Sequence, residues 1–95
     1  MKLKERVGVC LRTRNFRPVK AGGILSIDFD EKLKIVEIEW KGDGIYHYLK
    51  ATKNEWSEIT KYANKGKGLT GYVNSKFKDH HDYYQLIVLP EPVLG

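Results

Sequence analysis

Three strand-like runs joined by very short links constrain the fold of this chain more than any other feature. Residues 24–29, 33–40 and 45–49 are rich in β-branched and aromatic residues, which favour strands. The links are a polar triplet at residues 30–32 and a glycine-containing turn at residues 41–44. Because a parallel crossover needs a dozen or more residues, these links predict an antiparallel meander.

A helix-start signal follows the third run. Residues 52–55, Thr-Lys-Asn-Glu, have the pattern of a capping box, in which the Thr and Glu side chains satisfy amides at the start of a helix. Apolar residues then recur at helical spacing, at Trp56, Ile59 and Ala63, and Gly66 supplies a stop. The pattern predicts a helix whose apolar stripe covers the sheet.

The amino-terminal part gives a strand and then a loop. Val7, Val9 and Leu11 alternate with polar or small residues, as in a half-buried strand. Arg12 then falls on the opposite, wetter face of that strand, together with Arg14. Residues 14–23 contain a proline and two glycines, and they read as a loop.

The predicted fold class is α+β. Residues 71–78 predict a second short helix, and residues 83–89 predict a last strand that ends at Pro90. The sheet is expected to be small and antiparallel, a meander of about four to five strands covered on one face by one main helix and a second short helix. The 95 residues suit a single domain. Within it, residues 1–23 form a basic strand and loop extension, 24–89 the core and 90–95 a tail.

The net charge of +5 is concentrated near the amino terminus. Residues 1–20 hold seven basic residues against Glu5 alone, a local charge of +6. A basic segment of this kind suits an anionic partner such as nucleic acid, because neutralising phosphates releases counterions. A solvated basic edge that only aids solubility explains the same charges equally well.

The expected compartment is the cytoplasm. The single cysteine, Cys10, cannot form an intramolecular disulfide, and no signal peptide follows Met1. The longest apolar run, residues 86–89, is too short to cross a membrane.

A glycine-rich segment, residues 66–71, matches the G-x-G-x-x-G pattern literally. A dinucleotide site needs a preceding strand, whereas this segment follows a predicted helix. We therefore predict no cofactor and interpret the glycines as a helix exit. Lys65 and Lys67 in this loop could still hold a phosphate near the start of the next helix.

No catalytic or metal-binding constellation is recognisable. The adjacent His80 and His81 lack the i, i+4 geometry of a helical zinc site, and His47 reads as a sheet residue. Cys10 is expected to be buried and inert. Carboxylates that share strand faces, namely Asp28 with Asp30 and Glu37 with Glu39, are expected to face solvent. We predict a protein that is not an enzyme and binds no metal.

The run from Ser26 to Phe77 resembles the KTSC domain, a small module found at the carboxyl end of some lysyl-tRNA synthetases and alone in bacteria and phages. The matching pieces are Ser26, Ile27, Phe29, Gly44, Tyr46-His47-Tyr48, Trp56, Ile59, Ala63-Asn64-Lys65-Gly66, Tyr72-Val73-Asn74, Phe77 and Lys78. Asn64 stands where the family has Ser, and residues 67–71 look like an insertion. The synthetase association implies nucleic-acid binding by analogy alone.

The leading hypothesis is a non-catalytic nucleic-acid-binding module, for RNA or DNA. Aromatic residues interleaved with lysines are the ingredients of a stacking platform beside an electrostatic groove. The candidate contacts are Arg12, Arg14, Arg17, Lys65, Lys67, Lys76 and Lys78 for phosphates, and Tyr46, Tyr48 and Tyr72 for bases. The alternative is a protein-interaction or inhibitory module of the kind that a phage could encode, which uses its basic face or an edge strand. The state could be a monomer or a homodimer, and no membrane partner is expected.

Overall fold

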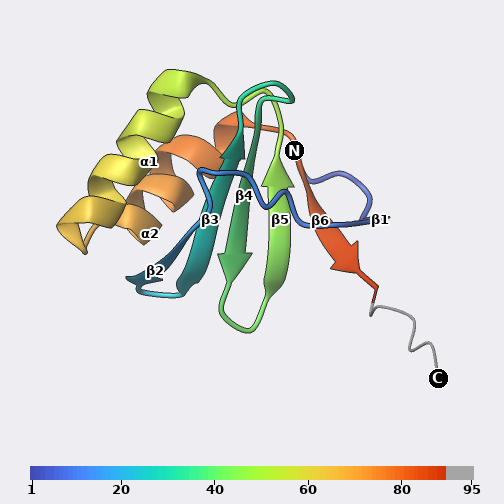
Figure 1. The fold of residues 1–95 in the computed structure, drawn as a ribbon, viewed down its shortest axis with the longest axis horizontal. Helices are drawn as coiled ribbons and strands as arrows, with labels where there is room; N and C mark the ends of the chain where they lie inside the picture. Colours follow the sequence, from blue (N-terminus) through green and yellow to red (C-terminus); the bar gives the residue numbers. More distant parts are fainter. Residues whose placement is uncertain (90–95) are drawn as a thin grey trace.

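The computed structural model describes residues 1–89 as a six-stranded mixed sheet with its helices on one face (Figure 1). The tail predicted at residues 90–95 lies outside the described residues. In chain order the elements are β1 (Arg6–Gly8), β2 (Arg17–Ala21), β3 (Ile24–Asp30), β4 (Ile35–Trp40), β5 (Gly44–Tyr48), α1 (Lys53–Lys65), α2 (Leu69–Tyr72), the π-helical turn η1 (Val73–Phe77), the 3-10 turn η2 (Lys78–His80) and β6 (Tyr83–Val88). The strand order across the sheet is β1-β6-β5-β4-β3-β2.

The predicted meander and main helix are confirmed. β3, β4 and β5 pair antiparallel in succession, with Phe29 opposite Val36 and Val36 opposite Tyr48. Thr52 caps α1 through both bonds of the capping box, and Gly66 ends the helix in the left-handed conformation at φ 74°. The second helical segment runs through α2, η1 and η2, so the α+β class is confirmed.

Two predictions about the amino-terminal part were wrong. β2 lies where we expected a loop, because it is an edge strand, where the missing amide of Pro18 costs no ladder bond. β1 pairs in parallel with β6, Gly8 opposite Val88, so the sheet is mixed rather than purely antiparallel. β2 is the strand that raises the expected four to five strands to six.

The core lies between the sheet and the helices. Ile59 of α1 is fully buried, and the Trp56 ring stacks on Phe29 with 5.5 Å between ring centroids. Val73 and Phe77 from the second helical segment are also fully buried. We call this side the helix face of the sheet.

The opposite side, which we call the polar face, is crossed by residues 9–16, here named the strap (Figure 1). The predicted strand with Val7 and Val9 turned inward was wrong. Of the predicted run, only Val7 and Gly8 belong to the paired strand β1, and the side chains of Val7 and Val9 are 66% and 80% exposed. Within residues 1–89, no helix is long and apolar enough to cross a membrane.

Candidate functional site

A cleft of about 400 Å³ opens on the helix face, and three tyrosines line it. Tyr46 and Tyr48 occupy alternate positions of β5, so both side chains lie on this face, while His47 between them lies on the other. Tyr83 stands opposite Tyr48 on β6, and their ring centroids are 5.3 Å apart. The alternation in β5 therefore builds an aromatic floor, which we call the tyrosine cleft.

The second helical segment supplies one wall of the tyrosine cleft. Asn74 of η1 and Lys78 of η2 line it, four residues apart, so they lie near one another on the helical surface. Phe77 anchors this wall, because its buried ring packs on Tyr48 at a centroid distance of 5.3 Å. The wall thus presents one amide and one ammonium group towards the tyrosines.

The β4–β5 turn supplies the opposite wall. Trp40 and Asp43 line the tyrosine cleft there. Gly44 has φ 98°, a backbone conformation that favours glycine, and a Cβ at this position would also displace the Gln85 amide, whose Nε2 would lie 2.6 Å away. The same Gln85 amide donates to the carbonyl of Asp43 at 3.1 Å, which holds the turn against β6.

Lys2 completes the lining from the amino-terminal segment. Backbone bonds tie this segment to β6, from the amide of Leu3 to the carbonyl of Tyr83 and from the amide of Tyr83 to the carbonyl of Met1. They bring Nζ of Lys2 to 5.7 Å from the centroid of the Tyr46 ring. The lining therefore contains two ammonium groups and one carboxylate.

The hydroxyls of Tyr46 and Tyr48 are held in the neutral form. Burial raises the pKa of Tyr48 well above its usual value, although the hydrogen bond from Trp40 acts in the opposite direction. Burial and the nearby Asp43 carboxylate raise the pKa of Tyr46. Neutral phenols can both donate and accept hydrogen bonds, so the cleft offers polar contacts as well as ring surface.

The cleft brings together three of the residues predicted from the sequence, Tyr46, Tyr48 and Lys78. The two β5 tyrosines are not an exposed stacking platform, because they are only 7% and 1% exposed. Tyr46 packs against Tyr83, and Tyr48 packs against both Phe77 and Tyr83, so neither ring is free to receive a stacked base.

A second group of predicted residues gathers where α1 ends. Tyr72 stacks on Tyr62 at 5.2 Å, and Nζ of Lys65 lies 5.6 Å from the centroid of that Tyr62 ring. Arg17 donates to Oδ1 of Asn64 at 2.9 Å. Lys67 is exposed in the glycine-rich exit that follows α1, as the sequence predicted for that segment. This group lies outside the lining of the tyrosine cleft.

The remaining predicted residues do not join either group. Arg12 and Arg14 are exposed on the strap, across the sheet from the cleft. Lys76 is exposed on η1, between two of the wall residues of the cleft in sequence but not part of its lining. The basic side chains are therefore distributed over both sides of the sheet.

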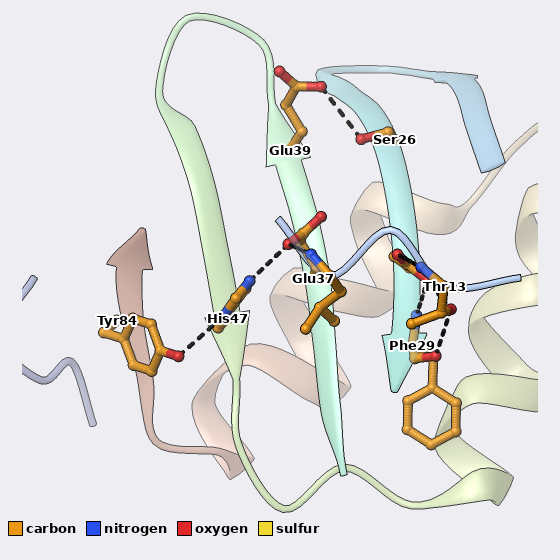
Figure 2. Close-up of polar contacts among 9 residues, drawn as sticks. Thr13, Ser26, Phe29, Glu37, Glu39, His47 and Tyr84 are labelled. Atoms are coloured by element: carbon orange, nitrogen blue, oxygen red, sulfur yellow. Dashed lines mark hydrogen bonds and ion pairs between the residues drawn. The ribbon is translucent and has the colours of Figure 1, made fainter. Parts of the chain in front are cut away.

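The polar face holds a hydrogen-bonded chain of three side chains (Figure 2). The hydroxyl of Tyr84 lies 2.9 Å from Nδ1 of His47, and Nε2 of His47 lies 2.7 Å from Oε2 of Glu37. Because a carboxylate only accepts, Nε2 carries the proton. All three side chains are buried, which corrects the expectation that Glu37 faces solvent.

The strap explains this burial. The amide of Leu11 donates to Oε2 of Glu37, and the amide of Thr13 donates to Oδ2 of Asp28, each at 2.9 Å. The Thr13 hydroxyl also bonds Asp28, whose side chain is fully buried (Figure 2). Asp28 was likewise expected in solvent, and that expectation was wrong because the sequence pattern does not reveal the covering segment.

Cys10 and His81 are two further side chains that could be reactive. Burial, followed by the nearby Glu37 carboxylate, raises the pKa of the half-buried Cys10 thiol, so less of the thiolate nucleophile is present. His81 is buried between the carbonyl of Leu49 and the Glu55 carboxylate. Among residues 1–89, no cluster of three or more His, Cys, Asp or Glu side chains has metal-site geometry.

Five residues of the cleft lining were not among the predicted site residues: Lys2, Trp40, Asp43, Asn74 and Tyr83. Asn74 carried a signal, since it stands in the family-like Tyr-Val-Asn piece. Trp40 and Asp43 flank a recognisable turn, but their approach to Lys78 depends on how the second helical segment packs. Lys2 reaches the cleft through the β1–β6 side of the sheet, which was not predicted.

The KTSC domain model matches residues 21–83 of the chain. The chain belongs to the KTSC domain family. The matched range holds every element from β3 to η2, and it excludes β1 and the strap. The cleft residues from Trp40 to Tyr83 therefore belong to the family domain, whereas Lys2 belongs to the extension.

A solved structure supports the fold assignment. The crystal structure of a KTSC domain protein from Yersinia pestis superimposes with a TM-score of 0.60 at 20% sequence identity, over 74% of this chain and 93% of the other. A search of curated proteins returns no match.

Proposed function

We propose that this KTSC domain is a non-catalytic module that binds nucleic acid through the tyrosine cleft. The observation that carries the proposal is the meeting of Lys2 and Lys78 at a floor of three tyrosines. Ammonium groups contact phosphates, and because Tyr46 and Tyr48 are largely buried, contact with an unstacked base falls mainly to the half-buried Tyr83 and Trp40. The cleft volume of about 400 Å³ also lies in the range of small-ligand sites.

Further phosphate contacts are available outside the cleft. Lys76 is exposed on the same helical segment as Lys78, and Lys65 and Lys67 lie beyond it where α1 ends. A strand that leaves the cleft along the helices would meet these side chains. Arg12 and Arg14 lie across the sheet and have no part in this path.

The non-catalytic part of the proposal is supported by the state of the polar face. Its most enzyme-like feature, the Tyr84–His47–Glu37 chain, is buried and hydrogen-bonded at each link. The strap bonds Glu37 at one end, and the Arg6 guanidinium lies 4.8 Å from the centroid of the Tyr84 ring at the other. A base must reach its substrate within hydrogen-bond distance, directly or through one water, so we interpret this buried chain as structural.

The test is binding of labelled single- and double-stranded RNA and DNA, followed by fluorescence anisotropy over a range of salt concentrations. We expect affinity to fall steeply with salt, and each lost phosphate contact to lower the log-log slope by roughly 0.7 to 0.9. Lys78→Ala and Lys2→Ala should weaken binding and flatten this slope. Lys53→Ala, an exposed lysine of α1 outside the cleft, is the matched control. Equal loss in all three variants would contradict the cleft as the site.

Protein interaction is the second candidate function, and the edge of the sheet favours it. Val7 and Val9, together with Val88 and Leu89, expose apolar side chains where β1 leaves one edge unpaired. Such an edge can extend the sheet of another chain. If no nucleic acid binds even at low salt, this function replaces the first, and pull-down with a Val7→Lys control identifies the partner.

A further inference from the structure

We propose that the tyrosine cleft receives one unpaired guanine base and that Asp43 reads its Watson–Crick edge. This inference rests on the proposed function and adds a base preference to it. Its starting point is the division of charge between the two walls. The carboxylate of Asp43 lies on the turn wall, and the ammonium group of Lys78 lies on the helical wall.

A nucleotide carries one group that suits each of these two walls. Its phosphate is an anion that suits Lys78, and its base carries N–H groups that suit a carboxylate. A repulsive carboxylate inside a site for phosphate alone would weaken binding, so Asp43 is better explained by a donor group on the ligand. Asp43 also raises the pKa of Tyr46, after burial, through its charge and as a hydrogen-bond partner, so the carboxylate lies beside the Tyr46 hydroxyl at the edge of the cleft.

The position of Asp43 favours an unpaired base. Tyr46 and Tyr48 are largely buried, and Trp40 is half-buried in the lining of the cleft. In a duplex the Watson–Crick donors are used by the partner strand, so Asp43 could reach them only in a single strand or a flipped nucleotide. We therefore expect single strands to bind more tightly than duplexes of the same sequence.

The acceptor-only chemistry of a carboxylate selects among the bases. Guanine presents two neighbouring donors on this edge, its ring N–H and its amino group, and these match the two oxygens of Asp43. Uracil and thymine present one N–H between two carbonyl oxygens, which the carboxylate would repel. A good bidentate pair is worth about 1–3 kcal/mol of discrimination, which corresponds to roughly 5- to 150-fold in affinity.

The experiment compares short oligouridine strands whose central nucleotide is guanosine, inosine or uridine. Inosine keeps the ring N–H of guanine but lacks the amino group. For the wild-type chain we expect the guanosine strand to bind about 10-fold more tightly than the uridine strand, with inosine between them. In Asp43→Asn the guanosine-to-uridine ratio should fall towards one, while the uridine strand still binds.

Two controls distinguish a failure of this inference from a failure of the proposed nucleic-acid binding. Lys78→Ala should weaken all three strands and keep the guanosine preference. Binding by the wild-type chain without a guanosine preference, or a preference that Asp43→Asn leaves unchanged, overturns the inference and leaves the nucleic-acid proposal standing. If the wild-type chain binds none of the strands at low salt, both fall.

Discussion

The indole N–H of Trp40 donates a hydrogen bond of 3.1 Å to the hydroxyl of Tyr48, across the β4–β5 pair. This bond satisfies the hydroxyl of a tyrosine that is almost completely buried. It also fixes the Trp40 ring at the rim of the tyrosine cleft. The other tryptophan, Trp56 of α1, stacks on Phe29 of β3 and is not part of the cleft lining.

This arrangement makes the two tryptophans separate reporters. A ligand in the tyrosine cleft should change the fluorescence of Trp40 and leave Trp56 almost unaffected. We therefore expect an oligonucleotide titration to quench the wild-type chain and the Trp56→Phe variant. The Trp40→Phe variant should show little change in its emission. A response that follows Trp56 instead would place the ligand away from the cleft.

The strap should depend on the buried carboxylates of the polar face. Asp28→Ala removes the acceptor of both the amide and the hydroxyl of Thr13. The Thr13 hydroxyl keeps the carbonyl of Phe29 as an acceptor, but leaving the amide of Thr13 unpaired should lower the free energy of unfolding by about 2 kcal/mol. Hydrogen exchange checks the location, since the amide of Thr13 should exchange faster in Asp28→Ala.

Glu37→Ala is the matched variant for this prediction. Because the amide of Leu11 donates to Glu37, its hydrogen exchange should be faster in this variant. Exchange at the amide of Thr13, which donates to Asp28, should change less. Unchanged protection at both amides in both variants would show that the carboxylates do not hold the strap.

The capping box of α1 should make stability depend on acid pH. Partial burial alone would raise the pKa of Glu55, but hydrogen bonds from His81 and from the amide of Thr52 lower it below its ordinary value of 4.5. The ionised carboxylate therefore contributes stability above pH 4.5, and this contribution is lost as the pH falls through 4.5 towards the lowered value.

Glu55→Gln tests this dependence by chemical denaturation at several pH values. At neutral pH we expect it to cost about 1 kcal/mol of unfolding free energy, because Gln keeps an oxygen for the amide of Thr52 but loses the charge-assisted bond to His81. The difference from the wild-type chain should shrink below pH 4.5, where Glu55 itself becomes protonated. Glu58→Gln, on an exposed position of the same helix, should show no such dependence. A difference that stays constant with pH would contradict the assigned role of the charge.

The sequence predicted the parts of the fold that local patterns determine. The capping box at Thr52 and the stop at Gly66 bound α1 at the predicted ends, and the short links between β3, β4 and β5 leave room only for hairpins. β1 and the strap were misread, because their positions depend on contacts between distant parts of the chain. The pairing of Gly8 with Val88 has no local signal.

The candidate site was predicted in part for the same reason. Alternation in β5 placed Tyr46 and Tyr48 on one face, and that pattern is local. Their burial, and the meeting of Asp43 with Lys78 across the cleft, depend on the packing of the second helical segment. The burial of Asp28 and Glu37 likewise required the strap, since alternation shows only that they share the face opposite the core.

The most direct test of the tyrosine cleft as a nucleic-acid site is a two-dimensional NMR titration of the labelled chain with a short single-stranded RNA. We predict that the largest shifts fall on the Trp40 indole N–H, the Asn74 side-chain amide and the backbone amide of Lys78, and that Leu11 and Thr13 change little. Shifts confined to the strap or to the exposed β1 edge, or none at all at low salt, would contradict the account.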